Sequence, residues 1–299
     1  MGVGDDCALL RPRPGTELAV TVDTLVAGVH FLPDTDPVGL GHKSLAVNLS
    51  DLAAMGAEPA WVTLALTLPE SSERWLEGFA AGFLALAERY GVELVGGDTT
   101  RGPLSMTVQA MGFIPEQGGL RRSTAQPGDV IYVTGGLGLG GLGLKQLLGQ
   151  FPAGDAAALE RLLRPEPRVQ AGLVLRDIAS SCIDISDGLA ADLGHILEQS
   201  DVGGVLDWEA LPLPSAVAGY VEQTGDWRLP LTAGDDYELC FTVSAERERD
   251  LSLQFDALGC VASRVGIIDS ERGLRLRRKG ELSFFDESGY QHFGNSTVS

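Results

Sequence analysis

The sequence has little of what marks a nucleic-acid-binding or membrane-spanning protein. It contains only three lysines, Lys43, Lys145 and Lys279, and its 22 Lys and Arg residues face 41 Asp and Glu residues, for a formal net charge of −19. This charge would repel nucleic acids and anionic membranes, so neither is expected as a partner. The sequence shows no basic-then-apolar leader, and no apolar run approaches the roughly 20 residues of a membrane-spanning helix.

Paired cysteines and the common catalytic motifs are also missing. Cys7, Cys182, Cys240 and Cys260 show no C-x-x-C spacing, so we expect reduced, mostly buried thiols in a cytoplasmic protein. The sequence has no H-E-x-x-H motif, no grouped histidines, no Gly-Lys-Ser/Thr phosphate loop and no protein-kinase motif. A phosphate enzyme with this sequence would therefore bind its phosphates through metal ions and backbone groups.

The length and composition favour a folded protein of two domains. The chain has 299 residues, of which 44% are hydrophobic and 21% are charged. Segments 115–119 and 126–128 are rich in Gly and Pro and bracket a change of character. We therefore predict an N-terminal domain over residues 1–124 and a C-terminal α+β domain over residues 125–299.

The hydrophobic pattern predicts alternating strands and helices in both domains. Strands are expected at residues 7–10, 18–23, 59–68, 92–95, 105–113, 129–134 and 263–268, from Cys182, after Asp236, and in a hairpin near 274–282. Helices are expected at residues 42–55, 71–90, 156–163, 169–179, 189–199 and 245–258, with a short one after the glycines of 135–143.

The stretch at residues 45–59 predicts a buried helix that carries one acid, Asp51, among Leu, Ala and Met side chains. Gly56 and Pro59 are expected to end it. A carboxylate in apolar surroundings must be paired, take up a proton or bind a cation. Taken alone, this stretch favours a structural, hydrogen-bonded Asp51, so a functional role depends on the other acids of the chain.

Acidic residues recur at the predicted ends of elements, and all of them are aspartates. The set is Asp5, Asp6, Asp23, Asp51, Asp98, Asp184 and Asp187. Aspartate holds hard cations through one or two carboxylates, together with phosphate oxygens and water. Gly96 and Gly97 beside Asp98 would let backbone amides approach a phosphate. For Asp23 taken alone, a solvated aspartate at the end of a strand is the alternative.

The segment 135–143 follows a predicted strand and contains the pattern G-x-G-x-x-G at Gly136, Gly138 and Gly141. A dinucleotide site also needs a second strand that ends in an acid about 20 residues further on. The sequence instead predicts a helix at 156–163, and Arg164-Pro165-Glu166-Pro167 then breaks the chain. A Rossmann-type site is therefore not expected.

Several blocks together resemble the thiamine-monophosphate kinase family, part of the superfamily of aminoimidazole ribonucleotide synthetase and selenophosphate synthetase. They are residues 4–6, 22–31, 43–59, 96–102, Arg122, 184–189 and 236–241. The blocks occur in the family order over nearly the whole chain, and 43–59 is highly specific. The resemblance implies an α+β fold of two domains with mixed or antiparallel sheets and helices packed on one face. It also implies a homodimer paired through the first-domain sheets, with ATP and Mg²⁺ bound by the N-terminal domain.

The resemblance further implies that ATP phosphorylates thiamine monophosphate to thiamine diphosphate, and it assigns residues to each ligand. Magnesium ligands would be Asp6, Thr21, Val22 through its backbone, Asp23, Asp51, Asp98, Asp184 and Asp187. Gly97, Asp98, Arg122 and Ser186 would bind ATP, and His30, Asp235 and Tyr290 would bind the substrate. The family usually has a helical segment before Gly4-Asp5-Asp6, and commonly a glutamate in place of Asp235.

The charges of the expected substrates explain why metal ions would be needed. Two unit phosphate charges about 4 Å apart repel by roughly 4 kcal/mol at an effective dielectric constant of 20. Mg²⁺ that bridges the phosphates cancels this repulsion, and the attacking phosphate oxygen is already ionised, so no catalytic general base is expected.

Other interpretations stay open from the sequence. The chain could be another ATP-dependent enzyme of the superfamily with a different acceptor, or a metal- or nucleotide-binding protein without catalysis. His30 could be a hydrogen-bonded loop histidine, and Tyr290 an aromatic side chain packed on its domain.

Overall fold

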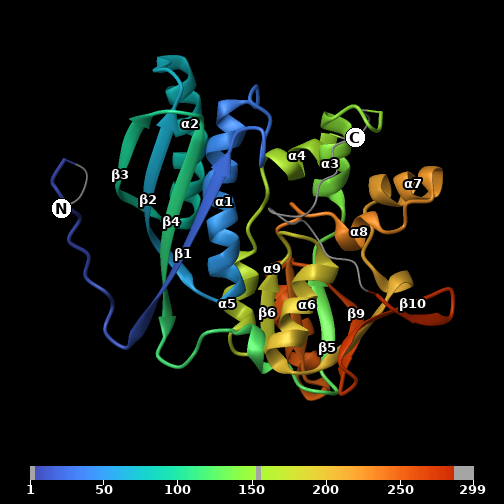
Figure 1. Cartoon of the computed structure of the whole chain (residues 1–299). Coiled ribbons are helices and arrows are strands. Elements are labelled where there is room, and N and C mark those ends of the chain that lie inside the picture. The colour runs from blue at the N-terminus through green and yellow to red at the C-terminus, as the bar shows by residue number, and fades with distance from the viewer. Residues whose placement is uncertain (1–3, 153–155, 286–299) are drawn as a thin grey trace. The chain divides into compact units, whose positions relative to one another are not determined.

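The structure is a computed structural model that describes residues 4–152 and 156–285 (Figure 1). Contacts divide the chain into two compact units. Unit 1 comprises Met1–Leu120 and Leu163–Asp177, and unit 2 comprises Arg121–Leu162 and Ile178–Ser299. The predicted boundary assigned everything from residue 125 onward to the second domain, whereas the contacts assign residues 163–177 to unit 1. The sequence gives no sign that the chain leaves unit 2 and returns to unit 1 for residues 163–177.

Unit 1 is built on a mixed sheet, which within the described residues has the strand order β1-β4-β2-β3. Its strands are β1 (Thr16–Val26), β2 (Glu58–Leu68), β3 (Glu93–Arg101) and β4 (Ser105–Pro115). β4 pairs antiparallel with β1 and β2, and β2 pairs parallel with β3. The helices of this unit are α1 (Pro37–Ala54), α2 (Glu73–Tyr90) and α5 (Val169–Leu175).

Helix α1 begins earlier than the sequence predicted, because Asp36 caps it. The Asp36 carboxylate accepts the backbone N–H of Gly39 at 3.0 Å, and Pro37 occupies the first turn, where no N–H is needed. The helix ends at Ala54, and Gly56 follows with φ of 65°. The prediction of a buried helix that contains Asp51 is therefore confirmed, with most of its side chains buried.

Helices α1 and α2 cross in backbone contact. A Cβ added at Gly41 would lie 2.0 Å from the carbonyl oxygen of Phe79 on α2. A Cβ added at Gly82 of α2 would lie 1.9 Å from the carbonyl oxygen of Val38 on α1. The two glycines therefore set how closely the helices pack.

Two strands of unit 1 continue past the points where the sequence predicted their ends. β1 reaches Val26 and β3 reaches Arg101, so Asp23 and Asp98 lie within strands rather than at their ends. Gly97, directly before Asp98, does not end β3 but allows its close pairing with β2, because a Cβ at Gly97 would lie 2.0 Å from the carbonyl oxygen of Leu64 on β2. The strand predicted at 7–10 is wrong, since these residues join neither sheet and adopt no regular secondary structure.

Unit 2 contains a second mixed sheet, whose order among the described residues is β11-β10-β7-β9-β5-β8-β6. Its strands are β5 (Val130–Thr134), β6 (Ser181–Asp184), β7 (Gly203–Asp207), β8 (Leu239–Val243), β9 (Ala262–Asp269), β10 (Gly273–Arg278) and β11 (Glu281–Phe284). The helices after β5, besides α5, are α3 (Leu139–Leu147), α4 (Ala156–Leu163), α6 (Leu189–Ser200), α7 (Ser215–Thr224), α8 (Leu229–Thr232) and α9 (Glu248–Leu258). Helices α7 and α8 were not predicted. Short 3-10 turns occupy Arg122–Thr124, Trp208–Ala210 and Ala245–Arg247.

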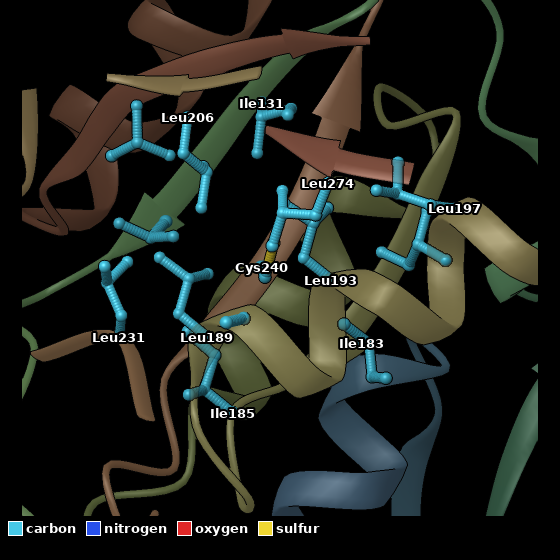
Figure 2. Packing of buried hydrophobic residues seen from close by; sticks show 14 of the residues in the cluster. Ile131, Ile183, Ile185, Leu189, Leu193, Leu197, Leu206, Leu231, Cys240 and Leu274 are labelled. Atoms are coloured by element: carbon cyan, nitrogen blue, oxygen red, sulfur yellow. The ribbon is translucent and has the colours of Figure 1, made fainter. Parts of the chain in front are cut away.

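The core of unit 2 lies between the sheet and helix α6 (Figure 2). Leu189 and Leu193 of α6 belong to one buried cluster with Cys240 of β8. The next residue, Phe241, points to the opposite face, as strand alternation requires, and its ring lies 5.9 Å from that of Phe255 on α9. Helices thus pack on both faces of this sheet, which the expectation of one covered face did not include.

The predicted α+β class with mixed sheets agrees with both units. None of the helices in the described part of the chain is long and apolar enough to cross a membrane.

Candidate functional site

Three of the predicted metal ligands come together in unit 1, where β1 faces α1. Thr21 and Asp23 alternate with Val22 along β1, so their side chains share one face of the sheet. The hydroxyl group of Thr21 donates a hydrogen bond to the carboxylate of Asp51 on α1. Burial, together with the nearby charge of Asp51, raises the pKa of Asp23 to about 7. Two carboxylates and a hydroxyl are therefore gathered in one half-buried place.

This donor set suits a hard divalent cation. Carboxylate and hydroxyl oxygens are ligands that Mg²⁺ accepts, and a cation would relieve the repulsion between Asp23 and Asp51. The set is small, however. Across residues 4–152 and 156–285, no group of three or more His, Cys, Asp or Glu residues is positioned to hold a metal ion. The carboxylates of Asp23 and Asp51 are thus only part of the ligand set that a metal site would need.

Asp98 is not part of this cluster. The strand registers align Asp98 with Ala65, Ala65 with Thr107, and Thr107 with Thr24. Thr24 is adjacent to Asp23 on β1, so Asp98 and Asp23 lie on opposite faces of the sheet. The side chain of Asp98 is exposed there.

Two further predicted residues of unit 1 lie in turns. Asp6 is exposed, and its backbone N–H donates to the carboxylate of Asp5 at 3.0 Å. His30 follows β1, and its Nδ1 accepts the backbone N–H of Val26 at 3.0 Å. The neutral ring therefore carries its proton on Nε2, because Nδ1 is used as an acceptor.

In unit 2, a buried carboxylate organises the turn that carries Ser186 and Asp187. Asp184 ends β6, and the turn leads into α6. The side chain of Asp192, in the first turn of α6, accepts the backbone N–H groups of Ser186 and Asp187, each at 3.0 Å. Burial raises the pKa of Asp192 to about 7, and the two N–H donors oppose that shift. The sequence analysis did not single out Asp192, although an acid in a first helical turn is a signal for capping of this kind.

Arg122 lies close to this turn. Its positive charge acts on Asp192 and lowers the pKa of that carboxyl. The carbonyl oxygen of Arg122 accepts the hydroxyl of Ser200 at the end of α6, at 2.8 Å. Arg122 and Ser186, both predicted to bind ATP, are thus linked through α6 and Asp192.

The segment that carries Asp235 runs beside the same turn. The N–H of Asp235 donates to the carbonyl oxygen of Ser186 at 2.9 Å, and that of Tyr237 to Ile185 at 2.8 Å. The N–H of Ile185 in turn donates to the carbonyl oxygen of Glu238 at 2.7 Å. Unit 2 therefore brings a predicted substrate residue, Asp235, next to the predicted ATP and metal residues of the turn. Tyr290 lies outside the described residues.

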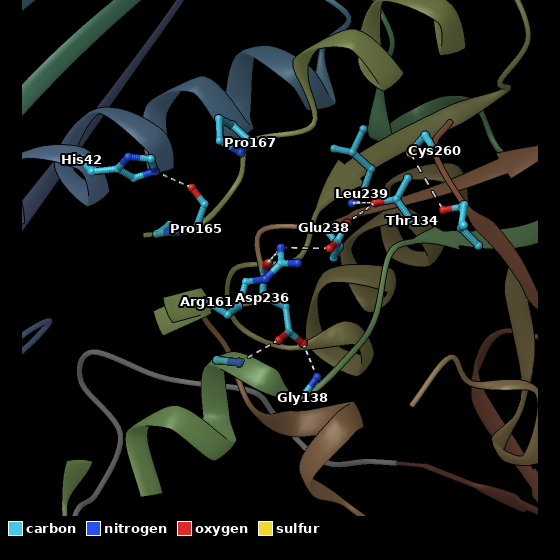
Figure 3. Close-up of polar contacts among 12 residues, drawn as sticks. His42, Thr134, Gly138, Arg161, Pro165, Pro167, Asp236, Glu238, Leu239 and Cys260 are labelled. Atoms are coloured by element: carbon cyan, nitrogen blue, oxygen red, sulfur yellow. Dashed lines mark hydrogen bonds and ion pairs between the residues drawn. The ribbon is translucent and has the colours of Figure 1, made fainter. Parts of the chain in front are cut away.

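Backbone N–H groups of the glycine-rich segment donate hydrogen bonds to a side chain of unit 2 (Figure 3). The N–H groups of Gly138 and Gly140 donate to the two carboxylate oxygens of Asp236 at 2.6 and 3.0 Å. Burial raises the pKa of Asp236 to about 7, against the effect of these two donors. The amides that a Rossmann loop would offer to a pyrophosphate are used by a side chain, in line with the expectation from sequence.

The sequence matches the families described as AIR synthase related protein, N-terminal domain, over residues 4–114, and AIR synthase related protein, C-terminal domain, over residues 126–279. It is similar to the thiamine-monophosphate kinase of Escherichia coli strain K12, with 49% identity over 298 residues. This match covers 98% of the chain and 92% of the relative.

Two solved structures are also similar. The crystal structure of thiamine-monophosphate kinase from Stenotrophomonas maltophilia K279a aligns with a TM-score of 0.88 and 46% identity, over 94% of this chain and 91% of that one. A complex described as AaThiL with AMPPCP and TMP aligns with a TM-score of 0.84 and 30% identity, over 95% and 89% of the two chains.

Proposed function

The chain belongs to the thiamine-monophosphate kinase family, and we propose that it transfers the terminal phosphoryl group of ATP directly to the phosphate of thiamine monophosphate. The observation that carries this proposal is the 49% identity to an enzyme of that name over 98% of the chain. The similarity to a complex with AMPPCP and TMP supports it further. The products are thiamine diphosphate and ADP.

The chemistry requires positioning more than proton transfer. An ionised phosphate oxygen of thiamine monophosphate attacks the γ-phosphorus of ATP, and the bond from that phosphorus to the β–γ bridging oxygen breaks. The electron pair of the broken bond leaves with ADP. Because the nucleophile carries no proton at neutral pH, no side chain needs to act as a general base. The protein has to align two anions that repel each other.

Mg²⁺, when bound, would neutralise the phosphates and hold them in line. We assign Asp23 and Asp51 to this ion because their carboxylates share one half-buried place with the hydroxyl of Thr21. The other proposed magnesium ligands are Asp6, Thr21, the backbone of Val22, Asp184, Asp187 and Asp98. Because Asp98 lies on the opposite face of the sheet from Asp23, it would hold a different ion. The turn that carries Asp187 is held by Asp192.

The proposed ATP contacts are Gly97, Asp98, Arg122 and Ser186. Thiamine monophosphate would contact His30, Asp235 and Tyr290. Nδ1 of His30 accepts the backbone N–H of Val26, so the neutral ring carries its proton on Nε2, a group of the kind that can donate to a phosphate oxygen.

We also propose a homodimer paired through the sheet of unit 1. Every second side chain of β1 points away from α1, and the apolar ones on that face are exposed: Leu18 by 40%, Val20 by 52% and Val22 by 61%. A row of exposed apolar side chains on a sheet is unfavourable in water unless another surface covers it. In the proposed homodimer, the second copy of the chain covers this row of side chains.

A cytoplasmic location is part of the proposal. All four cysteines are free thiols, two of them buried, which suits a reducing compartment. The net charge of −19 gives no reason to expect nucleic acid or membrane as a partner.

The test is an incubation of the protein with ATP, Mg²⁺ and thiamine monophosphate, followed by thin-layer separation of the thiamine esters. We expect thiamine diphosphate and ADP in equal amounts. ATP hydrolysis that does not respond to thiamine monophosphate would instead favour another acceptor, and no ATP turnover at all would favour a binding protein.

A further inference from the structure

The carboxylate of Asp236 caps a helix to which it does not belong. It is 1% exposed and accepts N–H groups from Gly138 and Gly140, at the start of α3. Gly138 is the N-cap residue of α3 and has no side chain with which to satisfy these donors. The N-terminal end of a helix attracts negative charge, so a carboxylate is well suited to this position. Asp236 thus links residues 234–238 to the glycine-rich segment at residues 135–143 through these hydrogen bonds.

The glycines permit this close contact. A Cβ added at Gly140 would lie 2.4 Å from the carbonyl oxygen of Asp235, and one added at Gly135 would lie 2.1 Å from Oε1 of Glu238. Both distances are too short for any side chain. The approach of residues 234–238 therefore explains why Gly135 and Gly140 of the glycine-rich segment carry no side chain.

A second buried carboxylate, that of Glu238, fixes the C-terminal end of residues 234–238. Glu238 is fully buried; it accepts the hydroxyl of Thr134 at 2.6 Å and forms an ion pair with Arg161 at 2.9 Å (Figure 3). Arg161 also donates to the carbonyl oxygen of Asp236 at 3.3 Å. The segment is thus fixed at two points, by Asp236 and by Glu238.

The residues beside Asp236 adopt an unusual backbone conformation. Asp235 has φ of 66° and Tyr237 has φ of 49°, in the left-handed region that residues other than glycine rarely adopt. Such conformations persist only where the surrounding structure imposes them, and they are common at functional sites. Here the hydrogen bonds of Asp236 impose them from one side, and the bond from Asp235 to Ser186 imposes them from the other.

We propose that Asp236 is a positioning residue that fixes the side chain of Asp235 against the thiamine-phosphate substrate. The inference rests on the proposed function, which assigns Asp235 to that substrate. Both oxygens of Asp236 are used by Gly138 and Gly140, so Asp236 acts through the backbone of its neighbour and does not touch the substrate. The glycine-rich segment supplies the N–H groups that hold Asp236 in place.

The first test is a comparison of Asp236→Asn with wild-type protein. The amide replaces one acceptor oxygen by an NH₂ group that faces an N–H donor, so one of the two bonds is lost. We expect the KM for thiamine monophosphate to rise about tenfold, as the loss of one hydrogen bond to a charged group allows. The KM for ATP should change by less than about twofold on the same scale. Equal rises of both KM values would overturn the proposal.

Asp129→Asn is the matched control. Asp129 is also buried, at 4% exposure, and accepts the backbone N–H of Gln126 at 3.0 Å in another turn of unit 2. Its replacement should lower stability without changing either KM. If Asp129→Asn produced the same rise in the KM for thiamine monophosphate, the effect of Asp236→Asn would be general loosening of the unit, and the proposal would be wrong.

A double-mutant cycle tests whether Asp236 acts through Asp235. Asp235→Ala should raise the KM for thiamine monophosphate, and Asp236→Asn should add nothing in that background. Additive effects would overturn the proposal. An unchanged KM in Asp235→Ala alone would overturn it as well, while the product assay on wild-type protein decides the proposed function independently.

Hydrogen exchange gives a readout that needs no activity. In Asp236→Asn, the amides of Gly138, Gly140 and Asp235 should exchange faster than in wild type, and in Asp129→Asn they should not. If Asp236→Asn does not fold, Gly140→Ala replaces it. There the added methyl group displaces the carbonyl of Asp235 while Asp236 is intact. The same selective rise in KM is expected, and an unchanged KM with unchanged exchange would overturn the proposal.

Discussion

The hydroxyl group of Thr21 on β1 donates a hydrogen bond to the carboxylate of Asp51 on α1, so a strand and a helix from distant parts of the sequence meet at one carboxylate. Asp23 shares the face of β1 that carries Thr21, and its pKa responds to the charge of Asp51. Two acids that disfavour each other's ionisation are costly to a fold, and they persist where a cation or a substrate uses them. We therefore expect this pair to serve the function of the protein rather than the stability of unit 1.

The first prediction follows from this pair. Asp51→Asn should abolish turnover and leave the fold intact, with thermal stability in the absence of metal equal to wild type or higher. The amide oxygen can still accept the hydroxyl of Thr21, and the repulsion with Asp23 is removed. Thermal unfolding with EDTA, together with the product assay, checks both parts. The control Glu58→Gln affects an exposed ion pair with Arg13 and should be silent. A mutant with a markedly lower melting temperature that keeps its activity would show a structural role for Asp51.

The second prediction concerns the exposed face of β1. Light scattering at micromolar concentration should give twice the chain mass of 31.5 kDa. Val20→Asp, at a side chain 52% exposed, should yield the single-chain mass, because a charge is costly in a covered apolar surface. Val261→Asp is the matched control, at an apolar side chain of unit 2 that is 66% exposed, and it should not change the mass. A wild-type protein of one chain mass would contradict the homodimer.

The third prediction tests the packing of α1 against α2. Gly82→Ala should lower the free energy of unfolding by about 1–3 kcal/mol, because the methyl group would meet the carbonyl of Val38. Gly194→Ala in α6 makes the same change in open space and should raise it by about 0.5–1 kcal/mol. Urea unfolding of both variants is the measurement. Equal effects of the two substitutions would mean that the helices do not cross in backbone contact.

The fourth prediction is a pH dependence that Asp236 imposes on stability. Burial raises its pKa from an ordinary 3.8 to about 7 in the folded protein. Between these values the folded protein keeps a proton that the unfolded chain has released, so this group lowers the free energy of unfolding as pH rises towards 7. About one pH unit above 7 its contribution becomes constant. The stability difference between wild type and Asp236→Asn should therefore shrink from pH 5 through pH 7 and level off near pH 8, as urea titrations can measure. Parallel curves would show that Asp236 does not titrate in this range.

The sequence predicted the elements whose signals are local and left out what depends on three-dimensional surroundings. The apolar pattern around Asp51 identified α1, and its start was missed because Asp36 caps the helix at a distance from that pattern. The short apolar run 7–10 resembles a strand in composition, yet an apolar run does not say whether a neighbouring strand is available. The hydrophobic pattern therefore predicted most of the helices and strands, but few of the contacts that they form with one another.

The candidate site divides in the same way. The proposed metal and substrate residues could be named from the sequence because the blocks that resemble the family occur in order along the chain. The buried anchors Asp192 and Asp236 could not be identified as such, since their role depends on which backbone N–H groups lie within reach. The opposite faces occupied by Asp23 and Asp98 also became visible only with the strand registers.

The last prediction concerns the acceptor. Thiamine monophosphate should be phosphorylated, and free thiamine should not. The proposed acids make sense if phosphate lies on both sides of the transferred group and draws Mg²⁺ between them. A neutral hydroxyl would bring no charge to hold those ions, and it would need a base within hydrogen-bond reach. Direct transfer also leaves no label on the protein after incubation with γ-labelled ATP. Efficient conversion of free thiamine, or a stable phosphoenzyme, would contradict this mechanism.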